Sequence, residues 1–474
     1  MSTNDFLARA LASLQETVAV ELRDDLRTSR TREFADCAGR VLARMHTDVA
    51  TAPALARERL DRWRRLTEGS PIAPPIEPVE EFHAHAAHVG RTLQEVTPPT
   101  AAWFKAAVSA TRDYLTAYER ALLKPGIKTS LARATPENQQ QRLSRYLAMR
   151  YPTLAADAVR SVRIVPGGRG KETSLVELSA NDVLPSRLVL RRDLSLSVTG
   201  TCAYAEFPLL QTVAALGLPV PTPLLAEKDP THLGGSFIIM TEIVDARTGG
   251  ELFAELNDLT LLAPSFAPDL VRALAKLHSV RTHPSGADLG GHAAGDDPLG
   301  RVRGFQQMFR GIVNKPPLHV ATELGFAWLL ANPLPEHRPH RLVHGDIGLH
   351  NVLVREGKLA AILDWELAHL GDPAEDIAFA WSPLLRHLLT WDEFVARYRE
   401  HGGETAACDR RAVAWYSVWA HTRNSVYTAM HYDWAASGRR PDIECFNAGT
   451  DFFDRTQYYI ALELDEALQD DSLS

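Results

Sequence analysis

One stretch, residues 342–376, constrains the fold and the chemistry of this chain more than any other part of its sequence. Short apolar runs in it alternate with side chains that can bind cations or protons. Those polar side chains belong to His344, Asp346, Asn351, Asp364 and Asp376. Carboxylate and amide oxygens suit a magnesium–phosphate site, and a further carboxylate can act as a base toward an acceptor hydroxyl. The stretch therefore indicates a phosphate-handling site built from one continuous segment.

The spacing inside this stretch predicts a β-hairpin. Residues 352–354 and 359–363 are apolar and predict two strands, while residues 355–358 between them have turn chemistry. Closing the hairpin returns Asp364 to within a position or two of Asn351 across the ladder. The spacing therefore places a carboxylate and an amide oxygen side by side, with Asp346 on the loop that enters the hairpin.

Composition excludes several classes of protein. The chain has 474 residues, of which 45% are hydrophobic and 23% charged, as in an ordinary globular protein of two or three domains. Its formal net charge of -8, with both signs spread along the chain, gives no case for nucleic acid. The four cysteines are far apart and form no CxxC pair, which favours a reduced protein. Since no membrane span or signal peptide is apparent, we expect a cytoplasmic protein.

The first predicted domain covers residues 1–134 and is helical. Apolar residues recur there at helical spacing, and a proline-rich segment at 71–78 interrupts them. We expect an all-α N-terminal domain or extension without catalytic residues. His83, His85 and His88 could suggest a metal site, but only the last two share a helix face and no cysteine accompanies them. Solvated or capping histidines are the favoured interpretation.

The second predicted domain covers residues 135–474. It begins with a helix, because Thr135 is a suitable N-cap and Pro136 occupies the first helical position. We expect a small strand-rich lobe, about 135–245, and a mostly helical lobe, about 246–474. Strands are predicted at 161–165, 174–178, 188–192 and 237–240, with a helix at 201–216. Further helices are predicted at 267–279, 381–400, 412–430 and 452–468.

A glycine-rich loop joins the first two predicted strands. Gly167, Gly168 and Gly170 would let the backbone approach phosphates closely. The pair Gly170-Lys171 does not make a P-loop, because Glu172 follows where Ser or Thr is required and because the flanking pattern is strand–loop–strand. Alone, such a loop is more often an ordinary turn than a phosphate cradle.

The ordered set of motifs resembles the aminoglycoside phosphotransferase and choline kinase-like enzymes, which share the protein-kinase-like fold. The resemblance rests on His344-Gly345-Asp346 with Asn351, on Leu363-Asp364-Trp365-Glu366, and on Gly371-Asp372-Pro373 with Asp376. It covers about residues 136–470, and the strand at 188–192 is similar to that of a branch found beside acyl-CoA dehydrogenases. The resemblance implies an α+β, bilobal fold with a small β-rich N-lobe and a mostly helical C-lobe.

The resemblance also implies a role for each matching residue. Asp346 would be the catalytic carboxylate, while Asn351 and Asp364 would hold Mg²⁺ on the phosphates of ATP. His344 would support the catalytic loop, and Asp376 would cap it from the following helix. The residues implied to bind ATP are Gly167, Gly168 and Gly170 over the phosphates, Arg191 with its helix partner Glu206, and Glu242 and Val244 through their backbone.

One departure from the family pattern concerns the strand cation. Arg191 stands where most kinases have lysine, and arginine can contact phosphate with bidentate geometry instead of as a point charge. The departure puts the pairing of Arg191 with Glu206 in question. Glu366 could either support the metal carboxylate or face the substrate, and His350 is expected to pack or bond locally.

The sequence thus predicts an ATP- and Mg²⁺-dependent kinase that transfers the γ-phosphate to a hydroxyl of a small molecule. The acceptors that stay open are an aminoglycoside or other antibiotic, a choline-like amino alcohol, and a hydroxyacyl-CoA thioester. The alternative from another class is a catalytically silent nucleotide-binding scaffold, against which the intact Asp346, Asn351 and Asp364 argue. A protein kinase fits the H-G-D and D-W-E motifs less well. Oligomeric state is not encoded in these motifs.

Overall fold

The computed structural model resolves the chain into two compact units. We call residues 132–296 and 335–416 the sheet-containing unit, and residues 1–131, 297–334 and 417–474 the helical unit. The structure describes residues 52–66, 84–86, 88–89, 101–122, 133–134, 137–165, 170–194, 197, 199–250, 258–281, 297–316, 318–440 and 443–469. Each unit is described by itself below.

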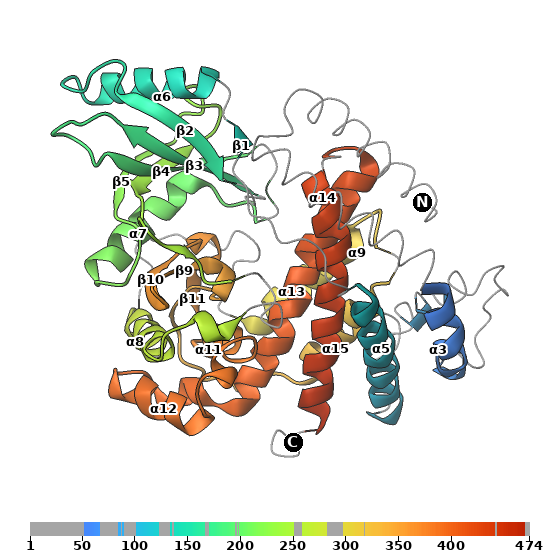
Figure 1. Cartoon of the computed structure of the whole chain (residues 1–474). Coiled ribbons are helices and arrows are strands. Elements are labelled where there is room, and N and C mark those ends of the chain that lie inside the picture. The colour runs from blue at the N-terminus through green and yellow to red at the C-terminus, as the bar shows by residue number, and fades with distance from the viewer. Residues whose placement is uncertain are drawn as a thin grey trace. The chain divides into compact units, whose positions relative to one another are not determined.

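The sheet-containing unit begins with a six-stranded antiparallel sheet in the order β1-β2-β3-β4-β6-β5 (Figure 1). Its central strands alternate buried and more exposed side chains, the period expected where one face packs on a core. The strands are β1 (Arg133–Ala134), β2 (Val159–Val165), β3 (Lys171–Leu178), β4 (Arg187–Asp193), β5 (Pro223–Glu227) and β6 (Phe237–Thr241). Strand β5 is not among the strands predicted from the sequence, because Pro219, Pro221 and Pro223 obscure its pattern.

Two helices pack against this sheet. Helix α6 (Glu137–Arg150) is the first helix predicted for the second domain, and its Leu143, Tyr146 and Leu147 join a buried cluster with Val162, Val176, Leu188 and Phe237. Helix α7 (Ala203–Ala215) contacts strands β4, β5 and β6, and buries Leu209, Leu210 and Val213. The sheet is therefore fixed by apolar burial, which leaves β3 and β4 as a rigid platform for polar side chains near α7.

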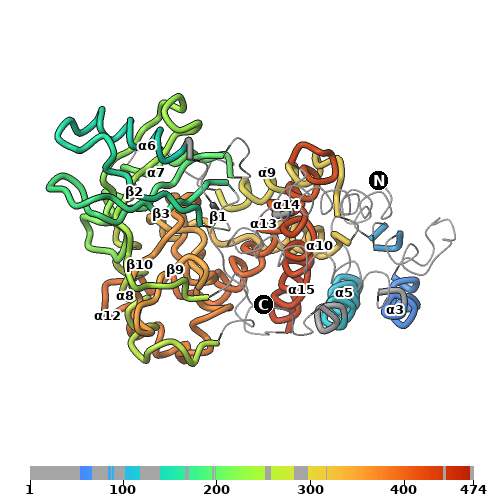
Figure 2. Tube along the Cα trace, turned by 45° about the horizontal axis from the view of Figure 1, so that its top comes forward, coloured from blue at the N-terminus to red at the C-terminus, as the bar shows by residue number. Residues whose placement is uncertain are grey.

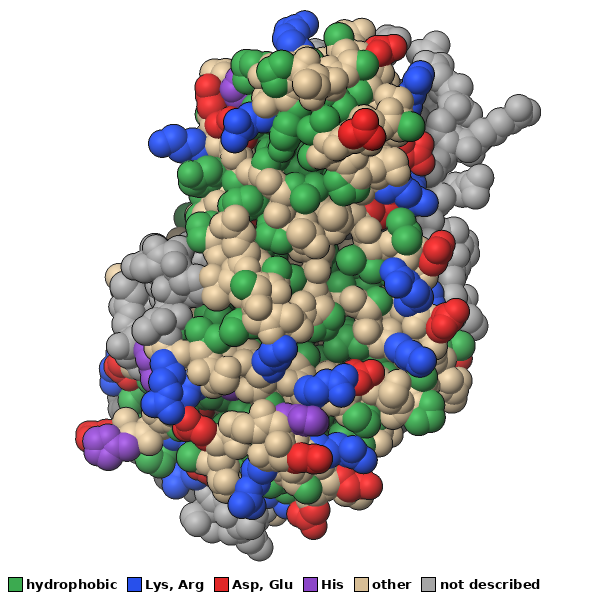
Figure 3. Space-filling view, turned by 90° about the vertical axis from the view of Figure 1, so that its left-hand side faces the viewer, with side chains coloured by type: hydrophobic (Ala, Val, Ile, Leu, Met, Phe, Trp, Pro, Cys, Tyr) green, Lys and Arg blue, Asp and Glu red, His purple; other side chains and the backbone are tan. Residues whose placement is uncertain are grey.

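The outer face of helix α7 is almost free of charge. Between Asp193 and Glu227 the sequence carries a single charged residue, Glu206, and that residue is buried. Figure 3 shows mainly hydrophobic and uncharged side chains over this part of the surface. A shallow depression of about 470 Å³ lies there, lined by Pro208, Gln211, Thr212, Ala215 and Leu216.

The remainder of the sheet-containing unit includes residues 342–376, the stretch that carries the predicted hairpin. Strands β9 and β10 form the predicted hairpin, β7 pairs with β9, and β11 pairs with β8. These strands are β7 (Arg247–Thr248), β8 (Arg341–Val343), β9 (Val352–Arg355), β10 (Lys358–Ile362) and β11 (His369–Gly371). The α-helices are α8 (Phe266–Leu277), α11 (Ala374–Trp381) and α12 (Trp391–Glu400). The 3-10 turns are η3 (Leu259–Leu261), η4 (Leu349–Asn351), η5 (Trp365–Leu367), η6 (Leu385–His387) and η7 (Thr405–Cys408).

The single helix predicted at 381–400 is wrong. Helix α11 ends at Trp381, and Pro383 follows two residues later, where its ring disfavours further helix. A new helix, α12, starts at Thr390, whose side chain and that of Glu393 form a capping box. The proline and the capping box therefore separate two helices that apolar periodicity alone predicts as one.

The helical unit combines segments that are distant in sequence. Helices α3 and α5 pack side by side, and α5 packs against α15, as Figures 1 and 2 both show. Arg112 of α5 forms an ion pair with Asp465 of α15. The bounds are α3 (Ala52–Leu66), α5 (Ala101–Leu122), α9 (Pro298–Gly311), α10 (Val320–Ala331), α13 (Arg410–Ser437), α14 (Ile443–Asn447), the π-helix η8 (Ala448–Phe452) and α15 (Phe453–Gln469). Residues 410–416 of α13 belong to the sheet-containing unit.

The packing of α5 gives a stability prediction. Leu115 on α5 is 2% exposed, so Leu115→Ala removes buried methyl groups and leaves a cavity. We expect a loss of roughly 2–5 kcal/mol of unfolding free energy, measured by denaturant titration. Lys105→Ala, on an exposed position of the same helix, is the matched control and should change stability by less than about 0.5 kcal/mol. Equal losses for the two variants would contradict a core role for α5.

The structure also bears on possible membrane spans, on the cysteines and on the three histidines near residue 85. Among the described residues, none of the helices has both the length and the apolar character needed to cross a lipid bilayer. Cys202, Cys408 and Cys445 carry free thiols, and Cys37 lies outside the described residues. His83 also lies outside them, while His85 and His88 lie in helical backbone.

Candidate active site

The site is built on the β9–β10 hairpin. Val352 pairs with Ile362 across the ladder, and the Leu363 N–H donates to the Asn351 carbonyl at 2.7 Å. Asp364 is the next residue, so the predicted return of this carboxylate to the neighbourhood of Asn351 is confirmed. The ladder has an irregularity between Leu359 and Ala361.

Asp346 and Asn351 are joined directly. The Asn351 Nδ2 donates to the Asp346 carboxylate at 3.0 Å and to the Asp346 main-chain carbonyl at 2.8 Å. These bonds fix the orientation of the amide, so its oxygen is the group that Asn351 can offer to a cation. The His350 Nε2 lies 3.4 Å from the same Asp346 carboxylate, which is the local bonding that the sequence led us to expect for this histidine.

The loop before Asp346 is held by Asp376 of helix α11. Its carboxylate accepts the N–H groups of His344 and Gly345, both at 2.7 Å, and it lies 3.1 Å from the His278 Nε2. The His278 Nδ1 lies 2.8 Å from the Tyr398 hydroxyl, so two further helices brace the carboxylate. These contacts are the capping geometry that the sequence had suggested for Asp376.

The removal of Asp376 should destabilise the protein. Asp376→Ala leaves two buried N–H groups without an acceptor, and each unsatisfied buried donor costs roughly 1–3 kcal/mol. We expect a loss of about 2–5 kcal/mol in unfolding free energy, measured by urea titration. Asp157→Ala, at an exposed turn of the same unit, is the control. A loss no larger than that of the control would show that the loop is held by other contacts.

Two backbone features keep the segment from His344 to Asp364 in place. Gly345 has a φ of +79°, and a Cβ there would lie 2.6 Å from the Leu367 carbonyl oxygen, so only glycine fits. Asp364 has a φ of 62° although it is not glycine, a conformation that stores strain and is found mainly where surrounding contacts enforce it. His344 supplies one such contact, since its Nε2 lies 2.8 Å from the Leu363 carbonyl.

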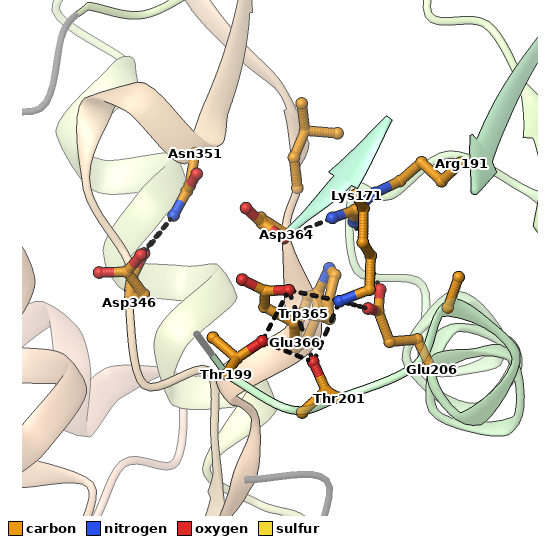
Figure 4. A network of polar contacts seen from close by, with 12 residues as sticks. Lys171, Arg191, Thr199, Thr201, Glu206, Asp346, Asn351, Asp364, Trp365 and Glu366 are labelled. Carbon is orange, nitrogen blue, oxygen red and sulfur yellow. Dashed lines mark hydrogen bonds and ion pairs between the residues drawn. The ribbon is translucent and has the colours of Figure 1, made fainter. Parts of the chain in front are cut away.

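Charged side chains of strands β3 and β4 and helix α7 meet Asp364 and Glu366 at the end of the hairpin (Figure 4). Arg191 of β4 reaches the Asp364 carboxylate at 2.6 Å and the Glu206 carboxylate at 3.3 Å. The pairing of Arg191 with Glu206 that the sequence left in question is therefore present. Lys171 of β3 lies 3.0 Å from the other Glu206 oxygen and also pairs with Glu366. We call these five residues the charge cluster.

Burial and charge act against each other on the ionisation of the charge cluster. Burial opposes the ionisation of Asp364, but the charges of Arg191 and Lys171 outweigh it and hold the Asp364 pKa below its ordinary value. Burial also opposes the charge on Lys171, yet Glu206 and Glu366 raise its pKa above the ordinary value. Burial and the neighbouring Asp364 raise the pKa of Glu366, although Lys171 acts in the opposite direction. Asp364 and Lys171 therefore stay charged at neutral pH.

The other residues predicted for nucleotide binding are placed as follows. Gly167 and Gly168 lie outside the described residues, while Gly170 immediately precedes β3. A Cβ at Gly170 would come within 2.7 Å of the Ser197 hydroxyl, so the Gly170 backbone lies close to the Ser197 side chain. Glu242 is bound by Arg187 at 2.7 and 2.9 Å, and the Val244 carbonyl accepts from Arg355. The proposed contacts of these residues with nucleotide stay predictions.

Sequence reasoning missed the part that Lys171 plays. Strand β3 begins at Lys171, three residues earlier than predicted, and this places the lysine on the sheet face that carries Arg191. The Thr201 hydroxyl accepts from Lys171 at 3.0 Å, and Thr199 contacts Glu366 at 3.4 Å. The sequence signal for this lysine is the Gly170-Lys171 pair, which does not form a P-loop.

The oxygen atoms at the end of the hairpin suit a Mg²⁺ ion whose other ligands are phosphates and water. They do not form a metal site made of protein ligands alone. Among the described residues there is no group of three or more His, Cys, Asp or Glu side chains with the geometry of a metal site. Mg²⁺ is commonly bound through one or two side-chain oxygens together with substrate phosphates and water. Asp364 and the amide oxygen of Asn351 are a donor set of that kind.

Comparison with known proteins identifies the family. The chain matches the Phosphotransferase enzyme family over residues 161–416, which is more than half of its length.

Curated relatives match the chain over part of its length. Acyl-CoA dehydrogenase family member 11 of Pongo abelii is 28% identical over 186 residues, covering 36% of this chain and 22% of the relative. Acyl-CoA dehydrogenase family member 10 of Mus musculus is 30% identical over 203 residues, covering 41% of this chain and 18% of the relative. The chain thus matches about a fifth of the length of these curated relatives.

Solved structures resemble the chain as well. A choline kinase from Streptococcus pneumoniae is 15% identical, with a TM-score of 0.46, and the match covers 69% of this chain and 100% of the kinase. The mixed architecture, with an antiparallel sheet followed by helices, agrees with the fold class predicted from the sequence. From the match over residues 161–416, the chain belongs to the phosphotransferase enzyme family.

Proposed function

We propose that the protein is a small-molecule kinase that uses ATP and Mg²⁺ and phosphorylates a hydroxyl group. The observation that carries the proposal is the grouping of Asp346, Asn351 and Asp364 at one end of the β9–β10 hairpin, with Arg191 directed at Asp364. A base, two oxygen ligands and a cation are the parts that phosphoryl transfer requires, because the reaction depends on positioning and charge neutralisation.

In the proposed reaction each residue has one task. Asp346 orients the acceptor hydroxyl and receives its proton while the hydroxyl oxygen forms a bond to the γ-phosphorus and the bond from that phosphorus to ADP breaks. Asn351 keeps Asp346 in place through its amide hydrogens, and its amide oxygen would be a ligand of the cation. Asp364 supplies the anionic ligand, and its lowered pKa keeps it ionised. Bound Mg²⁺ would neutralise the phosphate charge.

Arg191 has donors to spare for a phosphate. A guanidinium group carries five N–H donors, and contacts with Glu206 and Asp364 use one terminal nitrogen each. The remaining donors can bind a phosphate oxygen without loss of the pair with Glu206. The loop at 166–170 would cover the phosphates, and residues 242–244 would approach the adenine through their backbone.

The acceptor is the open part of the proposal, and the comparisons suggest which compounds to test. The names of the curated relatives point to acyl-CoA chemistry, and Hygromycin-B 4-O-kinase of Escherichia coli is 41% identical over 68 residues, covering 14% of this chain and 19% of that kinase. A hydroxyacyl-CoA thioester, an aminoglycoside and choline therefore form the first panel.

The experiment incubates the protein with ATP, Mg²⁺ and each panel compound, and follows the mass gain of one phosphate on the acceptor. Asp346→Ala and Asp364→Ala are run beside the wild type, and Asp157→Ala serves as a surface control. We expect turnover of at least one acceptor class by the wild type and the surface control alone. If the wild type phosphorylates no acceptor and binds ATP no better than Asp364→Ala, the protein is not a kinase of this kind.

A further inference from the structure

The charge cluster contains one more cation than the proposed phosphoryl transfer uses. Lys171 lies on β3 and Arg191 on β4, and the register pairs Lys171 with Asp193 and Thr173 with Arg191. Lys171 and Arg191 are therefore diagonal neighbours on one face of the sheet, within reach of the same partners. Both bind Glu206, one at each carboxylate oxygen, at 3.0 and 3.3 Å.

The two cations differ in how far their hydrogen-bonding capacity is used. An ammonium group has three donors, and Lys171 has three acceptors around it: Glu206, Glu366 and the Thr201 hydroxyl. Its side chain is 1% exposed. Arg191 is 13% exposed and has donors beyond those that it uses toward Glu206 and Asp364. Lys171 is thus enclosed by oxygen atoms of the protein, with hydrogen bonds to Glu366 and Thr201 and an ion pair to Glu206, whereas Arg191 has donors left for a phosphate.

We propose that Lys171 is a positioning residue that holds Glu206 and Glu366 in place, so that Arg191 is left to meet the nucleotide. The two tasks of a kinase strand cation, pairing with the helix carboxylate and contacting phosphate, are then shared between two residues. This inference rests on the proposed kinase function.

The charge balance of the cluster gives the reason. Two cations, Lys171 and Arg191, face three carboxylates: Glu206, Asp364 and Glu366. Without Lys171, three carboxylates compete for one guanidinium group, and Glu206, which is fully buried, is costly to leave without a full set of partners. Arg191 is then drawn toward Glu206 and Glu366, away from the position that serves a phosphate. Neutralising Glu366 at the same time restores the original excess of one negative charge.

The test is a set of matched variants: Lys171→Met, Glu366→Gln, the double variant and Lys171→Arg. Lys358→Met, at the exposed first position of β10, is the control. We expect Lys171→Met to raise the KM for ATP by roughly 10- to 100-fold, the loss of one charged hydrogen bond, with a smaller effect on kcat. The double variant should recover most of that loss, because its charge balance is restored. Lys171→Arg should lie between Lys171→Met and the wild type.

Two outcomes would overturn the inference. If Lys171→Met behaves like Lys358→Met, Lys171 has no part in the nucleotide site. If the double variant is no better than Lys171→Met, Lys171 contacts the nucleotide itself and is not a positioning residue.

Two further measurements keep the inference separate from folding and from the proposed function. Thermal unfolding of the same variants, without ATP, tests the Lys171–Glu366 pair even if the wild type proves to have no kinase activity. The double variant should then unfold at a higher temperature than Lys171→Met, and no difference would count against the pair. If Lys171→Met does not fold, the test is the ATP affinity of Lys171→Arg. A Lys171→Arg protein with wild-type ATP affinity and wild-type stability would refute the proposal that the geometry of the lysine side chain positions Glu206 and Glu366.

Discussion

Asp346→Asn is expected to lower kcat by roughly 10²- to 10⁴-fold, the usual contribution of a positioned proton acceptor. An amide cannot take the acceptor proton, but it can still meet the Asn351 side chain, so the loop should keep its shape. The KM for ATP should stay close to the wild-type value, because the proposed partner of Asp346 is the acceptor hydroxyl. Steady-state kinetics with the acceptor found in the panel measure both quantities.

The neighbouring histidine supplies the control for this prediction. The His350 Nε2 lies 3.4 Å from the Asp346 carboxylate, close enough to exchange a proton with it. His350→Asn should reduce kcat by much less than Asp346→Asn. If His350→Asn is the more damaging change, the histidine is the proton acceptor and Asp346 only orients it.

The second large effect is expected for Asp364→Asn, which should lose Mg²⁺-supported turnover by roughly 10²- to 10³-fold, equivalent to several kcal/mol of charge stabilisation. Asparagine tolerates the left-handed backbone at this position, so the change tests the charge with little added strain. The variant should also need a higher Mg²⁺ concentration for half-maximal rate. A titration of rate against Mg²⁺ at fixed ATP measures that shift.

Asp364→Ala separates the charge from the backbone. It removes the same carboxylate, but the left-handed backbone conformation at a φ of 62° costs more free energy for alanine than for asparagine. We therefore expect the alanine variant to be similarly inactive and less stable than the asparagine variant. An Asp364→Asn enzyme with wild-type Mg²⁺ dependence would show that the pair with Arg191 is structural and that the metal is held elsewhere.

The hairpin could be predicted because its information is local. The apolar runs, the turn residues and the spacing of Asn351 and Asp364 lie within a few positions of each other, and the ladder follows from them. Asp376 could be placed only through the family resemblance, since its contact with the His344 and Gly345 N–H groups crosses more than thirty positions.

The charge cluster could not be predicted because its geometry depends on sheet register. Lys171 and Glu366 are 195 positions apart, and no local pattern states that they meet. The same holds for the helical unit, where the partners Arg112 and Asp465 are 353 positions apart. Helix periodicity shows which face of α5 is buried, but it does not name the helix that covers it. The predicted domain boundary near residue 134 remains a prediction.

The close approach of Gly345 to the Leu367 carbonyl has an evolutionary consequence. It places the segment before Asp346 directly against the segment after Asp364, so a side chain at position 345 would push the two segments apart. In the proposed reaction, the spacing of the two carboxylates would then depend on a main-chain contact that tolerates almost no substitution at Gly345. A change of substrate would have to arise through residues outside this frame. Relatives could then diversify their acceptors while the reacting geometry stays the same.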